Sequence, residues 1–151
     1  MQNDQIYSEI INLVSTKDDL NLINNELDLL EEGIYETKGN TFDFVMENSI
    51  SGSLSILVSK LILGQDKETI IKKLKEQMLE VKFVELTIAI DPSKKFIEKL
   101  ANWLKESVDQ KIAIDIKIDH SIIGGTKIIF EGKYFDGSIK NKLDKILINY
   151  A

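Results

Sequence analysis

The sequence predicts an α+β protein in which an all-helical bundle precedes a small β-α-β-β-α domain. Apolar residues follow a helical period up to about residue 80, and from Val81 onward they alternate with polar residues. The run IAIDIKIDHSIIGGTKIIFEGKYFDG at residues 112–137 then places a strand, a Gly-Gly pair, a second strand and a tight turn in one segment. We therefore expect a helical bundle over residues 1–80 and a small α+β domain with a mixed sheet over residues 81–151.

The first 80 residues are expected to form four or five helices joined by short connections. A second helix can start at Ser15, Thr16 or Asp18, and the stretch NSISGS at residues 48–53 is expected to interrupt a third helical region. Gly64 suits the end of one helix, and Asp66 suits the N-cap of the next. The inward-facing apolar residues of these helices include Ile6, Ile10, Leu20, Ile23, Leu27, Leu30, Leu54, Leu57, Leu61, Ile70, Leu74 and Met78.

In the second part of the chain, the alternating pattern predicts strands at residues 81–91, 111–119 and 126–131 and a short strand at residues 134–135. Asp91 and Pro92 are expected to end the first strand and to start a helix. Ser138 is expected to cap a last helix. The predicted buried faces are Val84, Leu86, Ile88 and Ile90 in the first strand, Phe96, Ile97, Leu100, Ala101, Leu104 and Val108 in the helix, and Ile112, Ile114, Ile116 and Ile118 in the second strand.

Composition limits the classes of function. The chain has 151 residues, 19 basic residues that are all Lys, and no Cys, so disulfides, cysteine metal sites and bidentate Arg clamps are not expected. The absence of Arg and the abundance of Ile indicate an AT-rich genome. The start has no signal-peptide pattern, and the apolar stretch at residues 54–63 is far shorter than the about 20 residues of a spanning helix, which predicts a soluble protein with no direct membrane insertion.

The formal charge of −6 is divided unevenly along the chain. Residues 1–66 contain three Lys and twelve acids, whereas residues 67–151 contain sixteen Lys and thirteen acids. This asymmetry predicts different partners for the two parts or, alternatively, a solvated acidic helical face. It disfavours nucleic acid as a partner, because an acidic surface repels phosphate.

Few residues suggest chemistry. Gly124 and Gly125 lack the Lys-Ser/Thr of a phosphate loop and are expected to let the backbone reverse. His120 is the only His, which favours a loop or capping role over metal binding. Asp115, Asp119 and Asp136 could act as paired carboxylates, but turns and strand faces commonly carry such residues, and Asp136 is expected to shape its turn with Gly137 and Ser138. Trp103 is expected in core packing or at an interface. We expect no catalytic residue, cofactor or metal.

The second half resembles the delta subunit (OSCP) family of F-type ATP synthase. The resemblance covers residues 82–148 and rests on VELTIAIDP, KKFIEKLANWL, IDIKIDHSIIGG, TKIIFEGKYF and DGS followed by IKNKLDKIL, all at the family's spacing. The first 80 residues show no matching signature. His120 stands where the family usually has Pro.

The resemblance implies a non-catalytic stator subunit in the peripheral stalk of a bacterial-type synthase, on the cytoplasmic side of the plasma membrane. It implies that the helical half binds an N-terminal helix of the alpha subunit and that the C-terminal half binds the C-terminal helices of subunit b. Our candidate residues for the subunit b contact, chosen from the apolar set of the last helix, are Ile139, Leu143, Ile146, Leu147 and Tyr150.

Two alternatives remain open from the sequence. The first is an adaptor or regulatory binding module unrelated to ATP synthase. The second is a small enzyme, which would require a pocket that holds at least two carboxylates with perturbed pKa values.

Overall fold

The computed structural model describes residues 2–108, 111–138, 140–141 and 144. It confirms the α+β class and divides the chain into two compact units. The helical unit comprises Met1–Val14 and Asp18–Val81, and the sheet unit comprises Ser15–Lys17 and Lys82–Ala151. Each unit is described by itself below.

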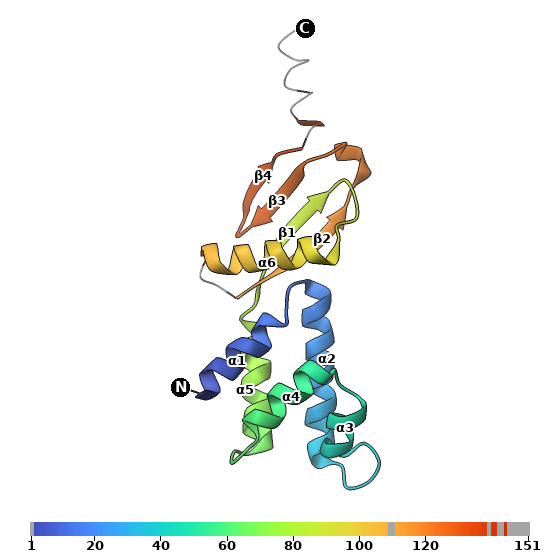
Figure 1. Cartoon of the computed structure of the whole chain (residues 1–151). Coiled ribbons are helices and arrows are strands. Elements are labelled where there is room, and N and C mark those ends of the chain that lie inside the picture. The colour runs from blue at the N-terminus through green and yellow to red at the C-terminus, as the bar shows by residue number, and fades with distance from the viewer. Residues whose placement is uncertain (1, 109–110, 139, 142–143, 145–151) are drawn as a thin grey trace. The chain divides into compact units, whose positions relative to one another are not determined.

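The helical unit contains five helices, each of which buries one apolar face (Figure 1). The predicted stop and start signals function as expected: Gly64 adopts φ +81°, and the Asp66 side chain accepts a hydrogen bond from the Thr69 backbone N–H at 2.9 Å. The helices are α1 (Gln2–Asn12), α2 (Lys17–Tyr35), α3 (Phe42–Asn48), α4 (Gly52–Leu61) and α5 (Lys67–Leu79). Their fully buried side chains include Ile10, Leu27, Leu30, Leu54, Leu61, Ile70, Ile71, Leu74 and Met78.

A buried carboxylate fixes the start of α4. Glu26, on α2, is only 7% exposed. Its carboxylate accepts hydrogen bonds from the Ser51 backbone N–H at 2.7 Å and from the Ser51 hydroxyl at 3.1 Å. Ser51 is the N-cap residue of α4, so a side chain on one helix satisfies the end of another. The sequence offered no sign of this role, because Glu26 lies among other acids on an apparently polar face.

The sheet unit is a four-stranded mixed sheet with strand order β2-β1-β3-β4. Strand β1 runs parallel to β2 and antiparallel to β3, and β3 and β4 form an antiparallel hairpin. Helix α6 crosses one face of the sheet, where Ala101 packs with Leu86, Ile88 and Ile114 (Figure 1). The elements are β1 (Lys82–Ile88), α6 (Lys94–Val108), β2 (Ile112–Ile118), the short 3₁₀ helix η1 (His120–Ile122), β3 (Thr126–Phe130) and β4 (Lys133–Asp136).

A segment from the start of the chain joins this sheet. Thr16 forms a parallel bridge with Ile114, whose backbone N–H donates to the Ser15 carbonyl at 2.9 Å. Lys17 continues the contact through a 3.0 Å salt bridge to Asp115. Ser15–Lys17 therefore groups with the sheet unit, and α2 begins at Lys17, within the predicted range for a helix start.

Several predicted faces differ from the structure. The strand at residues 81–91 ends at Ile88, so Ile90 lies in the following loop and is 74% exposed. The alternation predicted for the second strand is incomplete, because Ile112, Ala113 and Ile114 are all buried whereas Ile118, beyond the core under α6, is exposed. Phe96, predicted to face inward, is half-exposed at the start of α6.

Lys140, Asn141 and Asp144 are helical, as expected for a closing helix. The predicted apolar residues of that helix, Ile139, Leu143, Ile146 and Leu147, lie outside the described residues, as does Tyr150.

Candidate docking site at the Gly-Gly elbow

An apolar hollow of about 420 Å³ lies in the sheet unit where β1 ends and α6 begins. We call it the elbow hollow, because one wall is the Gly-Gly elbow, residues 122–125. Three large apolar side chains on its lining are exposed: Ile90, Phe96 and Ile123. Its lining residues are Ile88, Ala89, Ile90, Asp91, Pro92, Ser93, Phe96, Ile123, Gly124 and Gly125. Exposed apolar side chains around a concave surface are typical of a protein-binding site.

The backbone at Ile123 is strained. This β-branched residue adopts φ +68° and keeps its side chain 63% exposed at the rim of the hollow. Such a conformation is a genuine outlier for isoleucine, and strain of this kind costs about 1–3 kcal/mol and concentrates at functional sites. The strain makes Ile123 a candidate contact residue.

Hydrogen bonds hold the elbow against the end of β1. The Asp119 backbone N–H donates to the Ile88 carbonyl at 2.9 Å, and His120 Nδ1 lies 2.6 Å from the Ala89 carbonyl oxygen. Because a carbonyl oxygen can only accept, His120 Nδ1 carries the proton. The Asp119 carboxylate accepts from the Ser121 backbone N–H at 2.9 Å. His120 thus ties η1 to the loop that follows β1.

The two glycines of the elbow differ in role. Gly125 adopts φ +76°, and a Cβ there would lie 2.4 Å from the Gly137 carbonyl oxygen. Only glycine permits both this conformation and this close approach. Gly124 has no positive φ, and its backbone N–H donates to the Ile122 carbonyl at 2.7 Å.

The turn at residues 136–138 is held by the Asp136 carboxylate. One of its oxygens accepts from the Ser138 backbone N–H at 2.9 Å, and the other accepts from the Tyr134 hydroxyl at 3.2 Å. The Ser138 hydroxyl then accepts from the Asn141 backbone N–H at 3.2 Å. Hydrogen bonds from Ser138 hold the pKa of Asp136 below its ordinary value of 3.8.

The three carboxylates that could have formed a catalytic pair have separate structural partners. Asp115 pairs with Lys17, Asp119 caps η1, and Asp136 holds its turn. Within the described part of the chain, no cluster of three or more His, Cys, Asp or Glu residues is arranged to hold a metal ion. Trp103 is exposed on α6.

Sequence reasoning missed the apolar rim of this hollow. Ile90 and Phe96 were assigned to buried faces, since their periodicity matches that of their neighbours. Ile123 offered no signal, because nothing in the letters IIGG shows that the second isoleucine adopts a positive φ. The Asp-Pro pair at residues 91–92 gave the predicted end of this strand, whereas β1 already ends at Ile88.

The exposed apolar rim of the elbow hollow is typical of the class of proteins that offer docking surfaces to protein partners. The model of the ATP synthase delta (OSCP) subunit family matches residues 46–148. The chain therefore belongs to the ATP synthase delta (OSCP) subunit family. As a member of this family it is a stator subunit of an F-type ATP synthase, a membrane-associated complex, and family membership implies a non-catalytic subunit.

Curated relatives agree with the family match. ATP synthase subunit delta of Mycoplasma capricolum is 28% identical over 91% of this chain and 78% of the relative. The Wigglesworthia glossinidia brevipalpis subunit delta is 30% identical over 73% of this chain, and the Ureaplasma parvum subunit delta is 40% identical over 47% of it. The matched regions span 61% and 40% of those two relatives, so the chain matches less than two thirds of their length.

A solved mitochondrial ATP synthase hexamer from Toxoplasma gondii contains a chain that aligns with 99% of this one at 9% identity and a TM-score of 0.40. This likeness is too distant to carry an argument. Among the described residues, no helix combines the length and the apolar character that crossing a bilayer requires.

Proposed function

We propose that this chain links the catalytic alpha/beta head to subunit b of the peripheral stalk, so that the head does not rotate with the rotor. The observation that carries the proposal is the family match over residues 46–148, which includes the whole elbow hollow. Resisting torque requires two attachments that act together, and linkage within one chain gives the second attachment a high effective concentration.

In this proposal the sheet unit binds the C-terminal helices of subunit b. The elbow hollow supports this assignment, because the exposed Ile90, Phe96 and Ile123 offer apolar anchors around a concave surface. The residues Ile139, Leu143, Ile146, Leu147 and Tyr150 remain candidate contacts for the same partner. The helical unit binds an N-terminal helix of the alpha subunit. The assembly lies on the cytoplasmic side of the plasma membrane.

The test is binding of the full chain to a purified soluble domain of subunit b, measured by titration calorimetry. We expect Ile90→Asp to weaken this binding by about tenfold or more, because it places a charge at an apolar anchor. Leu63→Asp is the matched control, because Leu63 is 79% exposed, compared with 74% for Ile90, and does not line the hollow. Unchanged affinity of the Ile90 variant would reject the elbow hollow, and a wild-type chain that does not bind subunit b would reject the stator function.

A further inference from the structure

The turn at residues 136–138 contains a chemically reactive pair. Asp136 and Gly137 form the single Asp-Gly pair of the chain, which has no Asn-Gly pair. At such pairs the glycine nitrogen can attack the aspartate side chain, because glycine has no Cβ that hinders the approach. The backbone is then rerouted through the aspartate side chain, which gives isoaspartate. The geometry of the turn decides whether this reaction can proceed in the folded protein.

The peptide group between Asp136 and Gly137 is held at both ends. Its N–H donates to the Thr126 carbonyl at 2.8 Å, and its carbonyl accepts from the Asn141 side-chain amide at 3.0 Å. Asp136 is also the last residue of β4, and a strand ψ of about +135° turns the Gly137 nitrogen away from the Asp136 Cβ. The nitrogen therefore cannot approach the side-chain carboxyl carbon while the turn is closed.

The Asp136 carboxylate is held at both oxygens. One accepts from the Ser138 backbone N–H at 2.9 Å, and the other accepts from the Tyr134 hydroxyl at 3.2 Å. Hydrogen bonds from Ser138 also keep the pKa of this carboxyl below its ordinary value of 3.8, so it is ionised at neutral pH. An ionised carboxylate resists attack, because its oxygen leaves as water only after protonation.

The turn leaves little room for a side chain at residue 137. A Cβ added to Gly137 would lie 2.9 Å from the Phe135 ring and 3.3 Å from the Thr126 carbonyl oxygen. The Gly137 carbonyl oxygen is also the atom that a Cβ on Gly125 would meet at 2.4 Å. The packing of the turn against the elbow thus favours the same glycine that makes the pair reactive.

We propose that Asp136 and Gly137 form a latent isomerisation site, which the closed turn keeps unreactive and which opening of the turn exposes. In the open turn a water or hydroxide base removes the Gly137 amide proton, and the nitrogen electron pair forms a bond to the Asp136 side-chain carboxyl carbon. The carboxyl hydroxyl leaves with a proton as water, which gives a five-membered succinimide.

Hydrolysis of the succinimide completes the isomerisation. Water adds to the backbone carbonyl carbon of Asp136, and the bond from this carbon to the Gly137 nitrogen breaks. The nitrogen regains a proton and stays bonded to the side-chain carbonyl carbon, which gives isoaspartate. Hydrolysis at the side-chain carbonyl carbon instead regenerates aspartate. No atom is gained or lost overall.

Isoaspartate inserts one extra carbon, the Asp136 Cβ, into the backbone. The extra carbon changes the chain at the end of β4, where Asp136 pairs with Lys127, and moves the carboxylate away from the Ser138 N–H. The turn then cannot close as before, so the Gly137 carbonyl loses its place beside Gly125. The modification therefore makes an opening of the turn permanent and weakens the elbow.

Incubation of the full chain at neutral pH, with and without denaturing guanidinium chloride, tests the proposal. Fragmentation mass spectrometry of the peptide that contains residue 136 measures the rate at which isoaspartate forms. We expect the rate in the native chain to be at least about tenfold lower than in guanidinium, because only the open fraction of native molecules reacts. Equal rates in the two conditions, or no isoaspartate in either, would overturn the proposal.

Two Tyr→Phe variants test whether the turn provides the protection. Tyr134→Phe removes one hydrogen bond to the Asp136 carboxylate and should raise the native rate about twofold or more, without changing the rate in guanidinium. Tyr35→Phe is the matched control, because Tyr35 is 65% exposed, compared with 60% for Tyr134, and belongs to the helical unit. Asn141→Ala, which removes the hydrogen bond to the Asp136 carbonyl, should act in the same direction and replaces Tyr134→Phe if that variant fails to fold. Native rates equal to that of wild type, or an equal acceleration in Tyr35→Phe, would overturn the assignment of the protection to the turn.

Hydrogen exchange of the Gly137 amide tests whether isomerised chains can close the turn. After removal of guanidinium, unmodified chains should regain slow exchange, because this N–H donates to the Thr126 carbonyl, and isomerised chains should not. Slow exchange in both forms would overturn the predicted effect on the turn. Each measurement needs only the chain itself, so its outcome is independent of the binding test for the stator function.

Discussion

At the scale of single residues, Gly125 determines whether the elbow can form. Its positive φ and the nearby Gly137 carbonyl bring the start of β3 against the turn that follows β4. The same contact positions Ile123 at the rim of the elbow hollow, since only one residue separates the two. The docking surface therefore depends on a backbone approach that no side chain supplies.

We expect Gly125→Ala to destabilise the protein by more than the about 1–3 kcal/mol of a strained φ alone, because the added methyl group also collides with backbone. Gly132→Ala is the control that separates the two effects. Gly132 has the same φ of +76°, but a Cβ there meets nothing within 4 Å. Urea unfolding of both variants measures the difference, and equal losses of stability would contradict the close approach.

The Asp136 carboxylate should make the stability of the protein depend on pH. Hydrogen bonds from Ser138 lower the pKa of Asp136 in the folded protein. Its contribution is therefore present above the unfolded value near 3.8 and is lost as the pH falls through the lower folded value. Unfolding midpoints measured from neutral to acidic pH should fall less steeply in Asp136→Asn than in wild type.

Residue-level roles were only partly accessible from the sequence. Asp66 could be predicted as a helix cap, because capping is local and depends on residue type at a short spacing. Ile123 and Glu26 could not be assigned, since one depends on a backbone angle and the other on the packing of α2 against the start of α4. Tertiary contacts of this kind produce no periodic pattern in the amino-acid sequence.

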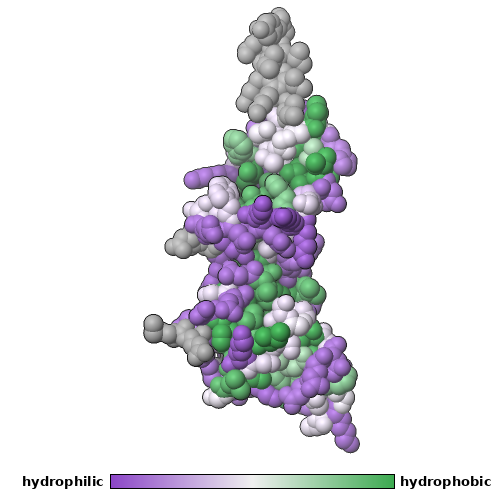
Figure 2. Space-filling view, viewed as in Figure 1, coloured by the Kyte–Doolittle hydropathy of each residue, from purple (hydrophilic) through white to green (hydrophobic). Residues whose placement is uncertain are grey.

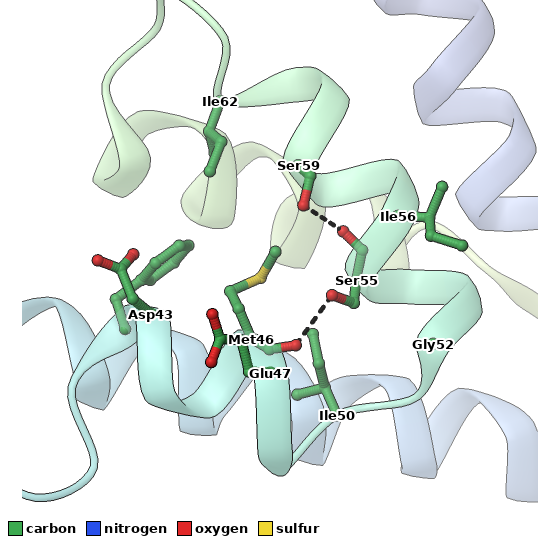
Figure 3. Close-up of a pocket in the computed structure, with 10 residues that line it drawn as sticks. Asp43, Met46, Glu47, Ile50, Gly52, Ser55, Ile56, Ser59 and Ile62 are labelled. Atoms are coloured by element: carbon green, nitrogen blue, oxygen red, sulfur yellow. Dashed lines mark hydrogen bonds between the residues drawn. The ribbon is translucent and has the colours of Figure 1, made fainter.

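At the scale of elements, α4 is positioned by a partner on another helix. Ser51 makes no side-chain cap bond to its own helix, and Glu26 supplies the acceptor for its backbone N–H and its hydroxyl. The same helix, together with α3, lines a pocket of about 570 Å³ (Figure 3). Any loosening of α4 should therefore lower the stability of the helical unit and change the shape of this pocket.

Replacing Glu26 with Ala should destabilise the protein by about 1–3 kcal/mol, because the partly buried donors of Ser51 lose their acceptor. Denaturant unfolding measures the loss. In a double-mutant cycle with Ser51→Ala, the two effects should be non-additive, because the residues share one interaction. Glu32→Ala, at an exposed position of the same helix, serves as the control. Strict additivity of the Glu26 and Ser51 changes would contradict the contact.

The segment Ser15–Lys17 combines a predicted helix start with a pairing that was not predicted. Ser15 and Thr16 are typical helix-capping residues, and α2 begins at Lys17, directly after them. The structure also pairs Thr16 with Ile114, almost one hundred positions away in the chain. Hydrophobic periodicity identifies the fold class and most elements, because it reflects burial within an element. It does not identify a three-residue pairing with the edge of a distant strand, although such pairing protects the edge.

At the scale of the whole molecule, the two units differ in charge. The helical unit carries fifteen acids and six Lys, and the sheet unit carries thirteen Lys and ten acids. Hydrophobic side chains also gather on the surface of the helical unit, whereas the outward face of α6 is mainly hydrophilic (Figure 2). Different surfaces suit different partners, as a protein that links the head to the stalk requires.

A substitution in the elbow hollow should leave the head contact intact. We expect Ile90→Asp to weaken binding of subunit b by about tenfold, without changing the affinity for the alpha/beta head. Titration calorimetry with each purified partner measures both affinities. Weakening of both contacts in a folded chain would show that the elbow hollow is not specific to subunit b.

The most direct test of the stator account is reconstitution of the three components. The purified alpha/beta head, a soluble dimer of subunit b and the full chain are mixed and analysed by sedimentation velocity. The account predicts one complex that contains all three, and no association of the head with subunit b when the chain is omitted. Association of head and subunit b to the same extent without the chain would contradict the proposed linking role.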